Sequence, residues 1–356
     1  MNTRFEIRLA SVPNSIWSKI TQIDELKGRW AGSVSLSPYV LNRLKRSVLI
    51  TSTGASTRIE GSHMTDEDIE KMLRGISIQT FNDRDKQEVQ GYYELLHNVF
   101  ESWMSLSFTE GTIKHFHQEL LKYAVKDVHH RGEYKYGENK VEMIDEKGQS
   151  HGVLFDTTPA YLTPTEMHEL VEWTQKALKE KTHHPLLIVG NFIVEFLNIH
   201  PFIDGNGRIS RILTNLLLLK EEYVYVPFVS HEKLIEDNKP EYYLALRKSQ
   251  KTIKTDKPDI TAWLEFFLTI LLNQSQMAIQ LLSEESIEKI LSPNQLKVWE
   301  YLQTTQETTP KKIVEQTGVA RPTVSQVLDK LMELKKVERI GLGSATRYRV
   351  VVRNTK

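Results

Sequence analysis

Residues 200–211, HPFIDGNGRISR, bring together the side chains that phosphate chemistry needs. They follow the mostly apolar stretch NFIVEFLNI and contain a histidine, an acid, two glycines around an asparagine, and two arginines. Gly205 and Gly207, which flank Asn206, allow backbone conformations with positive φ that aim several N–H groups into one concavity. Because such a nest binds anions, we expect an anion site in this stretch.

The two arginines extend this expectation to a polyphosphate. If the apolar stretch ILTNLLLL belongs to a helix that begins near Gly207, the positive end of that helix faces the nest. Arg208 and Arg211 are spaced i and i+3, so they lie on one face over the first turn. Two guanidinium groups at a helix N-terminus suit a ligand in which each can hold a different phosphate.

An acid and a base complete the set. Asp204 offers the hard oxygen that Mg²⁺ takes when it bridges phosphates. His200 has an unperturbed pKa near 6.5, which suits removal of a proton from a hydroxyl that attacks phosphorus. Taken singly, a histidine before proline is more often a helix cap, GNG more often a turn, and paired arginines more often a solvated face. Their occurrence together and in this order favours the chemical interpretation.

This stretch resembles the Fic signature, HPF-x-[DE]-GNGR-x-x-R, at every fixed position, and the resemblance covers roughly residues 35–290. The resemblance implies an all-helical Fic fold that transfers AMP from ATP to a Ser, Thr or Tyr hydroxyl of itself or of a target protein. Relatives that transfer phosphate replace GNGR with a variant that carries lysine. Because this chain keeps glycine and arginine there, protein adenylylation is the expected reaction.

The same resemblance assigns roles to individual residues. It implies that His200 is the catalytic base, that Asp204 holds Mg²⁺, and that Asn206 with the nest amides orients the α-phosphate. Arg208 is expected to take the β-phosphate and Arg211 the γ-phosphate. The residues expected to bind nucleotide are Gly205, Asn206, Gly207, Arg208, Ile209, Ser210, Arg211 and, in the segment NKPEYY that resembles the one closing over the nucleotide, Asn238.

A hairpin is expected within residues 131–158. Val141 and Met143 alternate with polar residues, DEKG supplies a turn, and Val153 and Phe155 continue the pattern on the return strand. Without the resemblance, an exposed hairpin is as often decoration as function. The resemblance implies a flap that binds the main chain of the target protein by strand addition.

The segment STRIEG, residues 56–61, is similar to the inhibitory motif [ST]-x-x-x-E-[GN] of the Fic family, with Ser56, Glu60 and Gly61 at the fixed positions. Ser56 and Glu60 share a helix face at i and i+4, and Gly61 is suited to end that helix. Taken alone, Glu60 would be an ordinary surface acid. The resemblance implies that Glu60 pairs with Arg211 and blocks the γ-phosphate position. Relatives in which this acid positions water also imply de-adenylylation as a second activity.

Composition limits the class of protein. The chain has 356 residues, a formal net charge of zero and no cysteine, which excludes disulfides and thiolate chemistry. The N-terminus has no apolar signal-peptide region, and no stretch offers about 18 uncharged apolar residues. We therefore expect a cytoplasmic protein without membrane segments, and its length predicts two or three domains.

The predicted architecture is mainly α: an N-terminal helical region at 1–110 with the inhibitory helix at about 50–61, and a Fic core at 111–290. Helix start signals lie at Ser37, at Thr65 with Asp68, at Thr163, and at Ser292 followed by Pro293. Further helices are expected in 86–127, 186–199, 207–221 and 239–282, the last interrupted at 255–258.

Residues 291–356 are expected to form a separate domain. Helix, glycine-containing turn, helix and two short strands resemble a winged helix-turn-helix. From residue 293 to 356 the chain has twelve Lys or Arg and six Asp or Glu, so this unit carries about +6 and the remainder about −6. This charge is typical of a nucleic-acid reader. However, its presumed recognition helix has few base-reading side chains beyond Arg321, Thr323, Ser325 and Gln326.

Several alternatives therefore remain open. The C-terminal unit has either DNA or a protein as its partner. The whole chain is either an adenylyltransferase or a transcription regulator whose core only senses nucleotide. A homodimer is a further expectation drawn from relatives.

Overall fold

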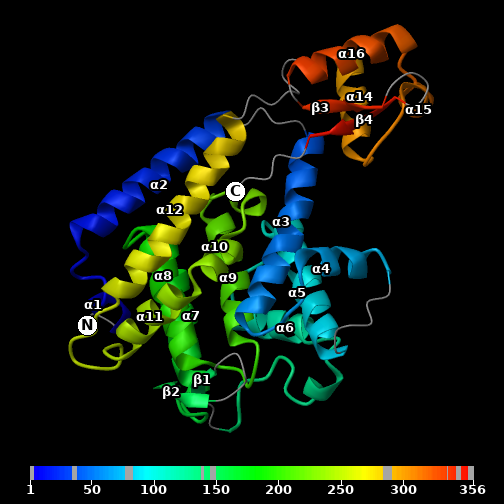
Figure 1. Ribbon diagram of the computed structural model, residues 1–356. Coiled ribbons are helices and arrows are strands. Elements are labelled where there is room, and N and C mark those ends of the chain that lie inside the picture. The colour runs from blue at the N-terminus through cyan, green and yellow to red at the C-terminus, as the bar shows by residue number, and fades with distance from the viewer. Residues whose placement is uncertain are drawn as a thin grey trace. The chain divides into compact units, whose positions relative to one another are not determined.

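The computed structural model describes residues 4–33, 38–76, 83–137, 140–144, 150–283, 291–334, 336–341 and 346–351 (Figure 1). The chain divides into two compact units, Met1–Leu282 and Ser283–Lys356. Each unit has its own hydrophobic core. The two units are therefore considered separately.

The first unit is mainly helical, with one pair of strands. Its helices are α1 (Arg4–Ile7), α2 (Asn14–Ser33), α3 (Pro38–Ile59), α4 (Asp66–Leu73), α5 (Asp83–Ser102), α6 (Glu110–Leu120), α7 (Thr163–Glu180), α8 (Pro185–Ile199), α9 (Asn206–Lys220), α10 (His231–Asp237), α11 (Lys239–Gln250) and α12 (Thr261–Ser283). Two short 3₁₀ helices, η1 (Val125–Asp127) and η2 (Val226–Phe228), lie between them. This content agrees with the expected mainly α fold.

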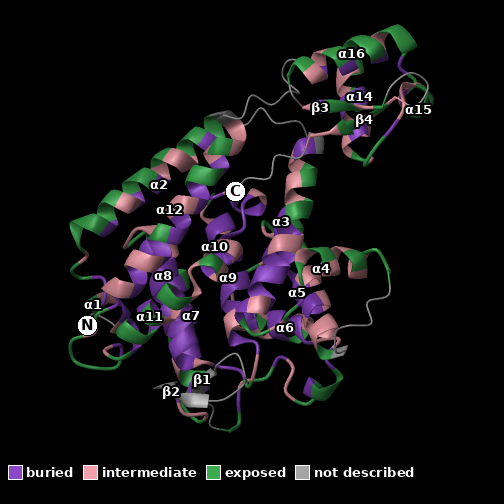
Figure 2. Ribbon diagram, in the orientation of Figure 1, coloured by how far each residue is buried: buried purple, intermediate pink, exposed green. Residues whose placement is uncertain are grey.

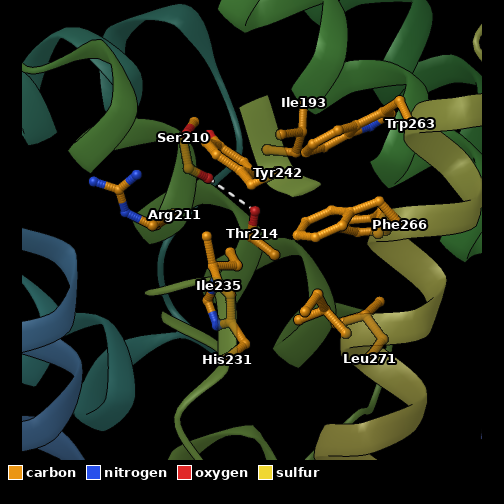
Figure 3. Close-up of a pocket in the computed structure, with 12 residues that line it drawn as sticks. Ile193, Ser210, Arg211, Thr214, His231, Ile235, Tyr242, Trp263, Phe266 and Leu271 are labelled. Carbon is orange, nitrogen blue, oxygen red and sulfur yellow. Dashed lines mark hydrogen bonds between the residues drawn. The ribbon is translucent and has the colours of Figure 1, made fainter. Parts of the chain in front are cut away.

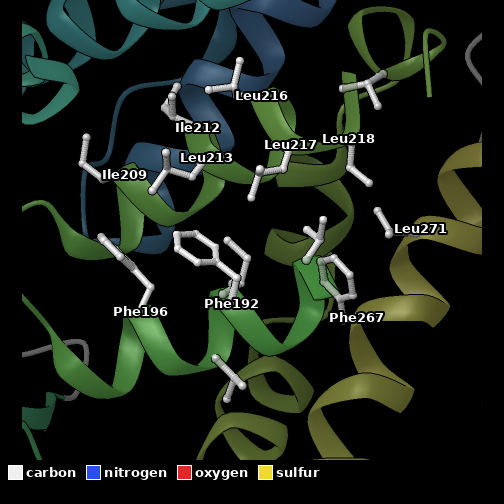
Figure 4. Packing of buried hydrophobic residues seen from close by; sticks show 14 of the residues in the cluster. Phe192, Phe196, Ile209, Ile212, Leu213, Leu216, Leu217, Leu218, Phe267 and Leu271 are labelled. Atoms are coloured by element: carbon white, nitrogen blue, oxygen red, sulfur yellow. The ribbon is translucent and has the colours of Figure 1, made fainter. Parts of the chain in front are cut away.

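Helices α8 and α9 form the centre of the first unit. Every residue of α8 from Leu186 to Ile199 is buried, and so is every residue of α9 from Arg208 to Leu219 (Figure 2). A helix that is buried all round needs neighbours on every side. Figure 4 shows Phe192 and Phe196 of α8 facing the apolar side chains of α9, with Phe267 and Leu271 of α12 beside them.

One hydrophobic core runs through the first unit from Phe5 to Ala278. Residues of the expected N-terminal region, 1–110, and of the expected core region that follows it contribute to this same core. Helices α3 and α5 pack against each other, and both contact α9. The N-terminal helices are therefore part of the body that positions residues 200–211.

Local capping signals account for several helix boundaries. Thr65 accepts a hydrogen bond from the Asp68 N–H, and the Asp68 carboxylate accepts one from the Thr65 N–H, which completes the predicted capping box of α4. Pro185 occupies the first turn of α8, where its missing N–H costs nothing. The predicted cap at Ser37 lies outside the described residues.

Strands β1 (Lys140–Ile144) and β2 (Ser150–Asp156) pair antiparallel, within the range where a hairpin is expected. Their register pairs Lys140 with Asp156 and Ile144 with Ser150, with irregularities between these ends. The predicted turn DEKG lies outside the described residues.

Helices α1, α2 and α10 were not among the expected elements. The predicted interruption of the stretch 239–282 is present but wider than expected, because α11 ends at Gln250 and α12 begins at Thr261. Helix α2 contacts α12 through Lys19, which pairs with Glu265. None of the helices in the described part of the chain is long and apolar enough to cross a membrane.

The second unit contains α14 (Pro293–Gln303), α15 (Pro310–Thr317), α16 (Arg321–Glu333), and the antiparallel strands β3 (Val337–Ile340) and β4 (Arg347–Val350). Ser292 and Gln295 form a capping box at the start of α14. Gly318, with a φ of 68°, ends α15 before the turn into α16. The three helices pack on a small apolar core that includes Trp299 and Val324.

The approach of α5 to α6 requires glycine at position 91. A Cβ on Gly91 would lie 2.0 Å from the backbone oxygen of Leu120, whereas a Cβ on Gly28, in the middle of α2, would meet nothing within 4 Å. We expect Gly91→Ala to lower the free energy of unfolding by about 2 kcal/mol or more, because the two backbones must separate. Gly28→Ala is the control and should raise the free energy of unfolding by about 0.5–1 kcal/mol, because alanine has a higher helix propensity than glycine.

Urea denaturation of the two variants and the parent chain measures both effects. Equal midpoints for Gly91→Ala and the parent would contradict the close approach of α5 and α6.

Candidate functional site

Residues 200–206 form a tight loop between the two central helices. Helix α8 ends at His200, whose backbone is left-handed at φ 53°, and α9 begins after Gly205, at φ 80°. The Asn206 side chain closes the loop, because its Oδ1 accepts from the Phe202 N–H at 2.9 Å and its Nδ2 donates to the Phe202 oxygen at 2.8 Å. Asn206 therefore acts on the loop through its side chain, and its backbone begins α9.

His117 of α6 supports the same loop. Its ring stacks on Phe202 with centroids 3.9 Å apart. Its Nδ1 accepts from the Gly132 N–H at 2.9 Å, so Nε2 carries the proton and donates to the Asp204 backbone oxygen at 3.1 Å. Burial lowers the pKa of His117 to about 4, which keeps the ring neutral and these two roles fixed.

The start of α9, where the sequence predicts an anion site, has features that favour an anion. Gly205 precedes the helix without a side-chain cap, so the first N–H groups of a 15-residue helix are free of a capping side chain. The positive end of the helix and these N–H groups favour an anion at this point. Arg208 and Arg211 both lie in the first two turns of α9, and each is 2 % exposed.

His200 is suited to accept a proton. Its Nδ1 donates to the Leu197 oxygen at 3.3 Å, which leaves Nε2 as the unprotonated nitrogen. Burial is the largest influence and lowers the pKa of His200 to about 4, Lys135 lowers it further, and Glu60 and Asp204 oppose this. The imidazole is therefore neutral at pH 7 and can act as a base.

Arg208 belongs to a closed ring of four charges. It forms ion pairs with Glu88 Oε2 at 2.7 Å and with Asp204 Oδ2 at 3.0 Å. Arg84 bonds the same two acids, at 2.8 Å to Glu88 Oε1 and 3.2 Å to Asp204 Oδ2. Both Arg84 and Glu88 come from α5, which the sequence did not connect with this site. Their long separation along the chain gave no local pattern that could have revealed them.

The ring sets the charge of Asp204. Burial alone would raise the pKa of this carboxyl, but Arg208, the Gly205 N–H and Arg84 outweigh burial and bring it below the ordinary value. Asp204 is 36 % exposed, so its carboxylate is ionised and reachable from solvent.

The residues present fit Mg²⁺ as a partner of phosphates. Within the described part of the chain no group of three His, Cys, Asp or Glu side chains could hold a metal ion. Mg²⁺ usually keeps several waters and takes one or two carboxylates together with substrate phosphates. Asp204 supplies one ionised carboxylate beside the anion site, which is sufficient for that mode of binding.

Arg211 is held by α3. Its Nε donates to Ser56 Oγ at 2.7 Å, and its Nη2 donates to the Ser56 oxygen at 2.9 Å and to Glu60 Oε1 at 2.7 Å. The Glu60 carboxylate also lies against Gly207, where an added Cβ would be 2.1 Å from Glu60 Oε1. Glu60 therefore places its negative charge at the start of α9, next to the residue expected to take a phosphate.

The end of α3 is anchored on two other helices. Arg58 bonds Glu236 of α10 at 2.6 Å and Asp66 of α4 at 2.9 Å. Gly61 follows at a φ of 103° and turns the chain away from α3. These contacts fix the position of the end of α3 and therefore the position of Glu60.

A mainly apolar pocket lies beside Arg211, on the side opposite to its guanidinium. Its lining includes Tyr242, Trp263 and Phe266. Figure 3 shows the guanidinium of Arg211 extending away from these aromatic rings. Burial raises the pKa of Tyr242 to about 12, so its hydroxyl remains protonated beside Arg211.

Three residues expected to bind nucleotide make hydrogen bonds within the fold. The Ile209 side chain is buried in the core, and its N–H donates to the Gly205 oxygen at 2.9 Å. The Ser210 hydroxyl donates to the Gly207 oxygen at 2.7 Å. Asn238 lies between α10 and α11, where its Nδ2 donates to the Leu234 oxygen at 2.8 Å.

Comparisons with known proteins agree with this geometry. Residues 107–218 match the family model described as the Fic/DOC family. The chain is 31% identical over 119 residues to a probable protein adenylyltransferase of Aquifex aeolicus, a match that covers 33% of this chain and 36% of that protein. It is 33% identical over 100 residues to a Fido domain-containing protein of Dictyostelium discoideum, covering 26% of this chain and 62% of that protein.

The matched segments therefore span less than two thirds of either relative. Among solved structures, the fold is similar to a Fic family protein from Desulfovibrio desulfuricans, with a TM-score of 0.67, 24% identity, and coverage of 97% of this chain and 98% of that one. This likeness concerns the fold.

The four-charge ring generates a stability prediction. Glu88→Gln leaves Arg208, which is almost fully buried, with Asp204 as its remaining acid in the ring. We expect the free energy of unfolding to fall by about 2–3 kcal/mol, because a buried charge that loses one partner is costly. Glu67→Gln removes an exposed pair with Lys71 and should cost about 0.5 kcal/mol or less.

Urea denaturation at neutral pH measures both variants. A loss for Glu88→Gln no larger than that for Glu67→Gln would show that the ring does not stabilise the site.

Proposed function

We propose that this chain, which contains a Fic/DOC family domain at residues 107–218, transfers AMP from ATP to a hydroxyl group of a protein. The observation that carries the proposal is the start of α9, where an uncapped helix end meets two buried arginines and a neutral histidine. Whether the modified protein is the chain itself or a separate target is decided by the labelling experiment below.

The phosphates of ATP would bind along the first turn of α9. Arg208 would take the β-phosphate and Arg211 the γ-phosphate, and the backbone N–H groups after Gly205 would take the α-phosphate. Each arginine is already paired with a carboxylate. A phosphate group is also an anion and would take the place of that carboxylate. Asp204 would hold Mg²⁺, which supplies neutralisation of the phosphate charge when bound.

His200 would act as the base. A Ser, Thr or Tyr hydroxyl gives its proton to Nε2 while its oxygen forms a bond to the α-phosphorus. The bond between the α-phosphorus and the bridging oxygen breaks, and pyrophosphate leaves. The neutral state of His200 at pH 7 suits this role, because a protonated imidazole could not accept the proton.

The paired strands β1 and β2 support a way to position the target hydroxyl. A two-stranded sheet exposes backbone N–H and C=O groups along its edges, to which an extended segment of a target protein can add. We propose that the flap expected at 131–158, to which these paired strands belong, is this binding element.

Glu60 would make the enzyme self-inhibited. Glu60 Oε1 is bonded to Arg211 at 2.7 Å, so its carboxylate would occupy the position that we propose for the γ-phosphate. ATP would then bind with its phosphates displaced, and a displacement of about 1 Å can cost around a hundredfold in rate. Glu60 is also 34 % exposed, so water can reach it, and it could position that water to release AMP from a modified protein.

The inhibition is tested by labelling with α-³²P-ATP and Mg²⁺, with cell lysate added. We expect Glu60→Gly to label itself or another protein about a hundredfold more than the parent chain, because Arg211 is freed for the γ-phosphate. Adding His200→Ala should abolish this labelling. Glu67→Gly, which removes an exposed acid on α4, should behave like the parent chain.

Intact mass identifies the group that is transferred. Silence of Glu60→Gly would overturn the self-inhibition, and the addition of a phosphate instead of AMP would overturn adenylyl transfer.

The second unit supports an alternative function, a transcription regulator whose first unit senses nucleotide. Helices α15 and α16 with strands β3 and β4 have the order of a winged helix-turn-helix, and the unit carries about +6. The exposed face of α16 has Arg321 and Gln326 near its start but Asp329 and Glu333 toward its end. The two acids would repel DNA phosphates, so we favour weak, sequence-independent binding.

A series of DNA mobility-shift assays at increasing salt concentration tests this alternative function. We expect binding to fall about a thousandfold between roughly 50 and 200 mM salt and to differ little between DNA sequences, because phosphate contacts dominate. Arg321→Ala should weaken all sequences alike. A complex that prefers one sequence and loses that preference in Arg321→Ala would instead support the regulator.

A further inference from the structure

His200 adopts a left-handed backbone conformation at the C-terminal end of α8. Its φ is 53° and its ψ is 60°, in the left-handed region that residues with a Cβ rarely occupy. Such a conformation persists at a functional residue only when the surrounding structure determines it. The groups that bond the backbone on either side of His200 are therefore of interest.

Lys135 bonds both of the carbonyl groups that flank His200. Its backbone N–H donates to the Pro201 oxygen at 2.8 Å, and its side-chain Nζ donates to the Ile199 oxygen at 3.0 Å. Lys135 is itself 3 % exposed, so the ammonium group lies inside the protein beside the base. Lys135 thus holds the carbonyl groups of the residues before and after His200.

The same ammonium group reaches the hairpin. Nζ of Lys135 donates to Thr157 Oγ1 at 2.9 Å. Thr157 directly follows β2, which ends at Asp156, and Lys135 itself lies five residues before β1 begins at Lys140. Lys135 therefore joins both ends of the hairpin to the backbone that carries His200.

We propose that Lys135 is a positioning residue that holds His200 in its left-handed conformation and keeps it in register with the hairpin. The proposal rests on the proposed function, in which His200 takes the proton of a hydroxyl presented by the hairpin. Lys135 itself touches neither ATP nor the reacting atoms, and it acts through Ile199, Pro201 and Thr157.

The charge of Lys135 allows this role to be tested through the pKa of His200. The groups that act on the His200 ring are burial, which has the largest effect and lowers its pKa, the Leu197 carbonyl, Lys135, Glu60 and Asp204. Lys135 is the cation among these charged groups and the acids oppose it. Removal of its charge should therefore raise the pKa of His200 above about 4, whereas a residue with only a packing role would leave it unchanged.

The neighbouring lysine offers a matched control. Lys254 Nζ donates to Thr158 Oγ1 at 2.7 Å, one residue further along the same hairpin end, and also pairs with Glu166 at 3.3 Å. Its side chain is 45 % exposed, and it makes no bond to residues 199–201 within the described part of the chain.

The experiment compares Lys135→Met, Lys135→Arg and Lys254→Met, each in the Glu60→Gly background. NMR titration of histidine ring protons, assigned with His200→Gln, follows the pKa of His200. Labelling with α-³²P-ATP at varied ATP concentration gives the maximal rate and the half-saturating concentration.

For Lys135→Met we expect a raised pKa of His200 and a rate lower by about tenfold to a hundredfold, with half-saturation by ATP nearly unchanged because Arg208 and Arg211 are not touched. Lys135→Arg should keep the low pKa and recover part of the rate. Lys254→Met should change neither quantity.

An unchanged pKa and rate in Lys135→Met would overturn the proposal, and so would an equal loss in Lys254→Met. If Lys135→Met does not fold, as judged by thermal unfolding, Lys135→Arg and Thr157→Val carry the test, and unaltered rates in both would overturn it. The titration does not depend on AMP transfer. A silent Glu60→Gly chain would therefore overturn the self-inhibition while the titration still decides the role of Lys135.

Discussion

The organisation of the site depends on one constraint, that the guanidinium of Arg211 is a charge removed from water. Burial lowers the pKa of this group, but Glu60 and neighbouring groups reverse the effect and hold it above its ordinary value. A buried cation must keep a partner at all times, because an unpaired one costs several kcal/mol. Helix α3 supplies that partner through Ser56 and Glu60, so the position of α3 and the state of Arg211 are coupled.

Arg208 is also a buried cation paired with an acid, but that acid comes from a different helix. Arg208 is equally buried and takes its partners from Asp204 and from Glu88 of α5. Each arginine of α9 is thus paired with one acid that lies outside the stretch 200–211, Glu88 for Arg208 and Glu60 for Arg211. The N-terminal helices α3 and α5 complete the charge balance of the site, which explains why they share the core of α8 and α9 instead of forming a separate body.

The sequence predicted those parts of the site that are local. The loop conformation follows from Gly205, and the i, i+3 spacing placed Arg208 and Arg211 on one turn. The pairing of Glu60 with Arg211 was anticipated only through the resemblance to a known family.

The contacts of Glu88 and Lys135 were not predicted, because they join residues 120 and 64 positions apart and leave no periodic trace. The side-chain role of Asn206 was also missed, since its amide satisfies the backbone of Phe202. Helix α2 is a different case, because Ile16, Ile20, Ile23 and Trp30 are buried at helical spacing, a pattern that was available in the sequence.

Gly207 connects these observations. In this structure a Cβ at position 207 would overlap Glu60 Oε1 at 2.1 Å, so the absence of a side chain is what lets the carboxylate reach the helix end and Arg211 together. A phosphate that approached the same N–H groups would need the same free space, because it seeks the same positive end of α9. One missing Cβ therefore admits two anions that exclude each other. Any residue larger than glycine would disturb the contact with Glu60 and the proposed substrate contact together, so this position cannot be used to separate them, whereas Glu60 can.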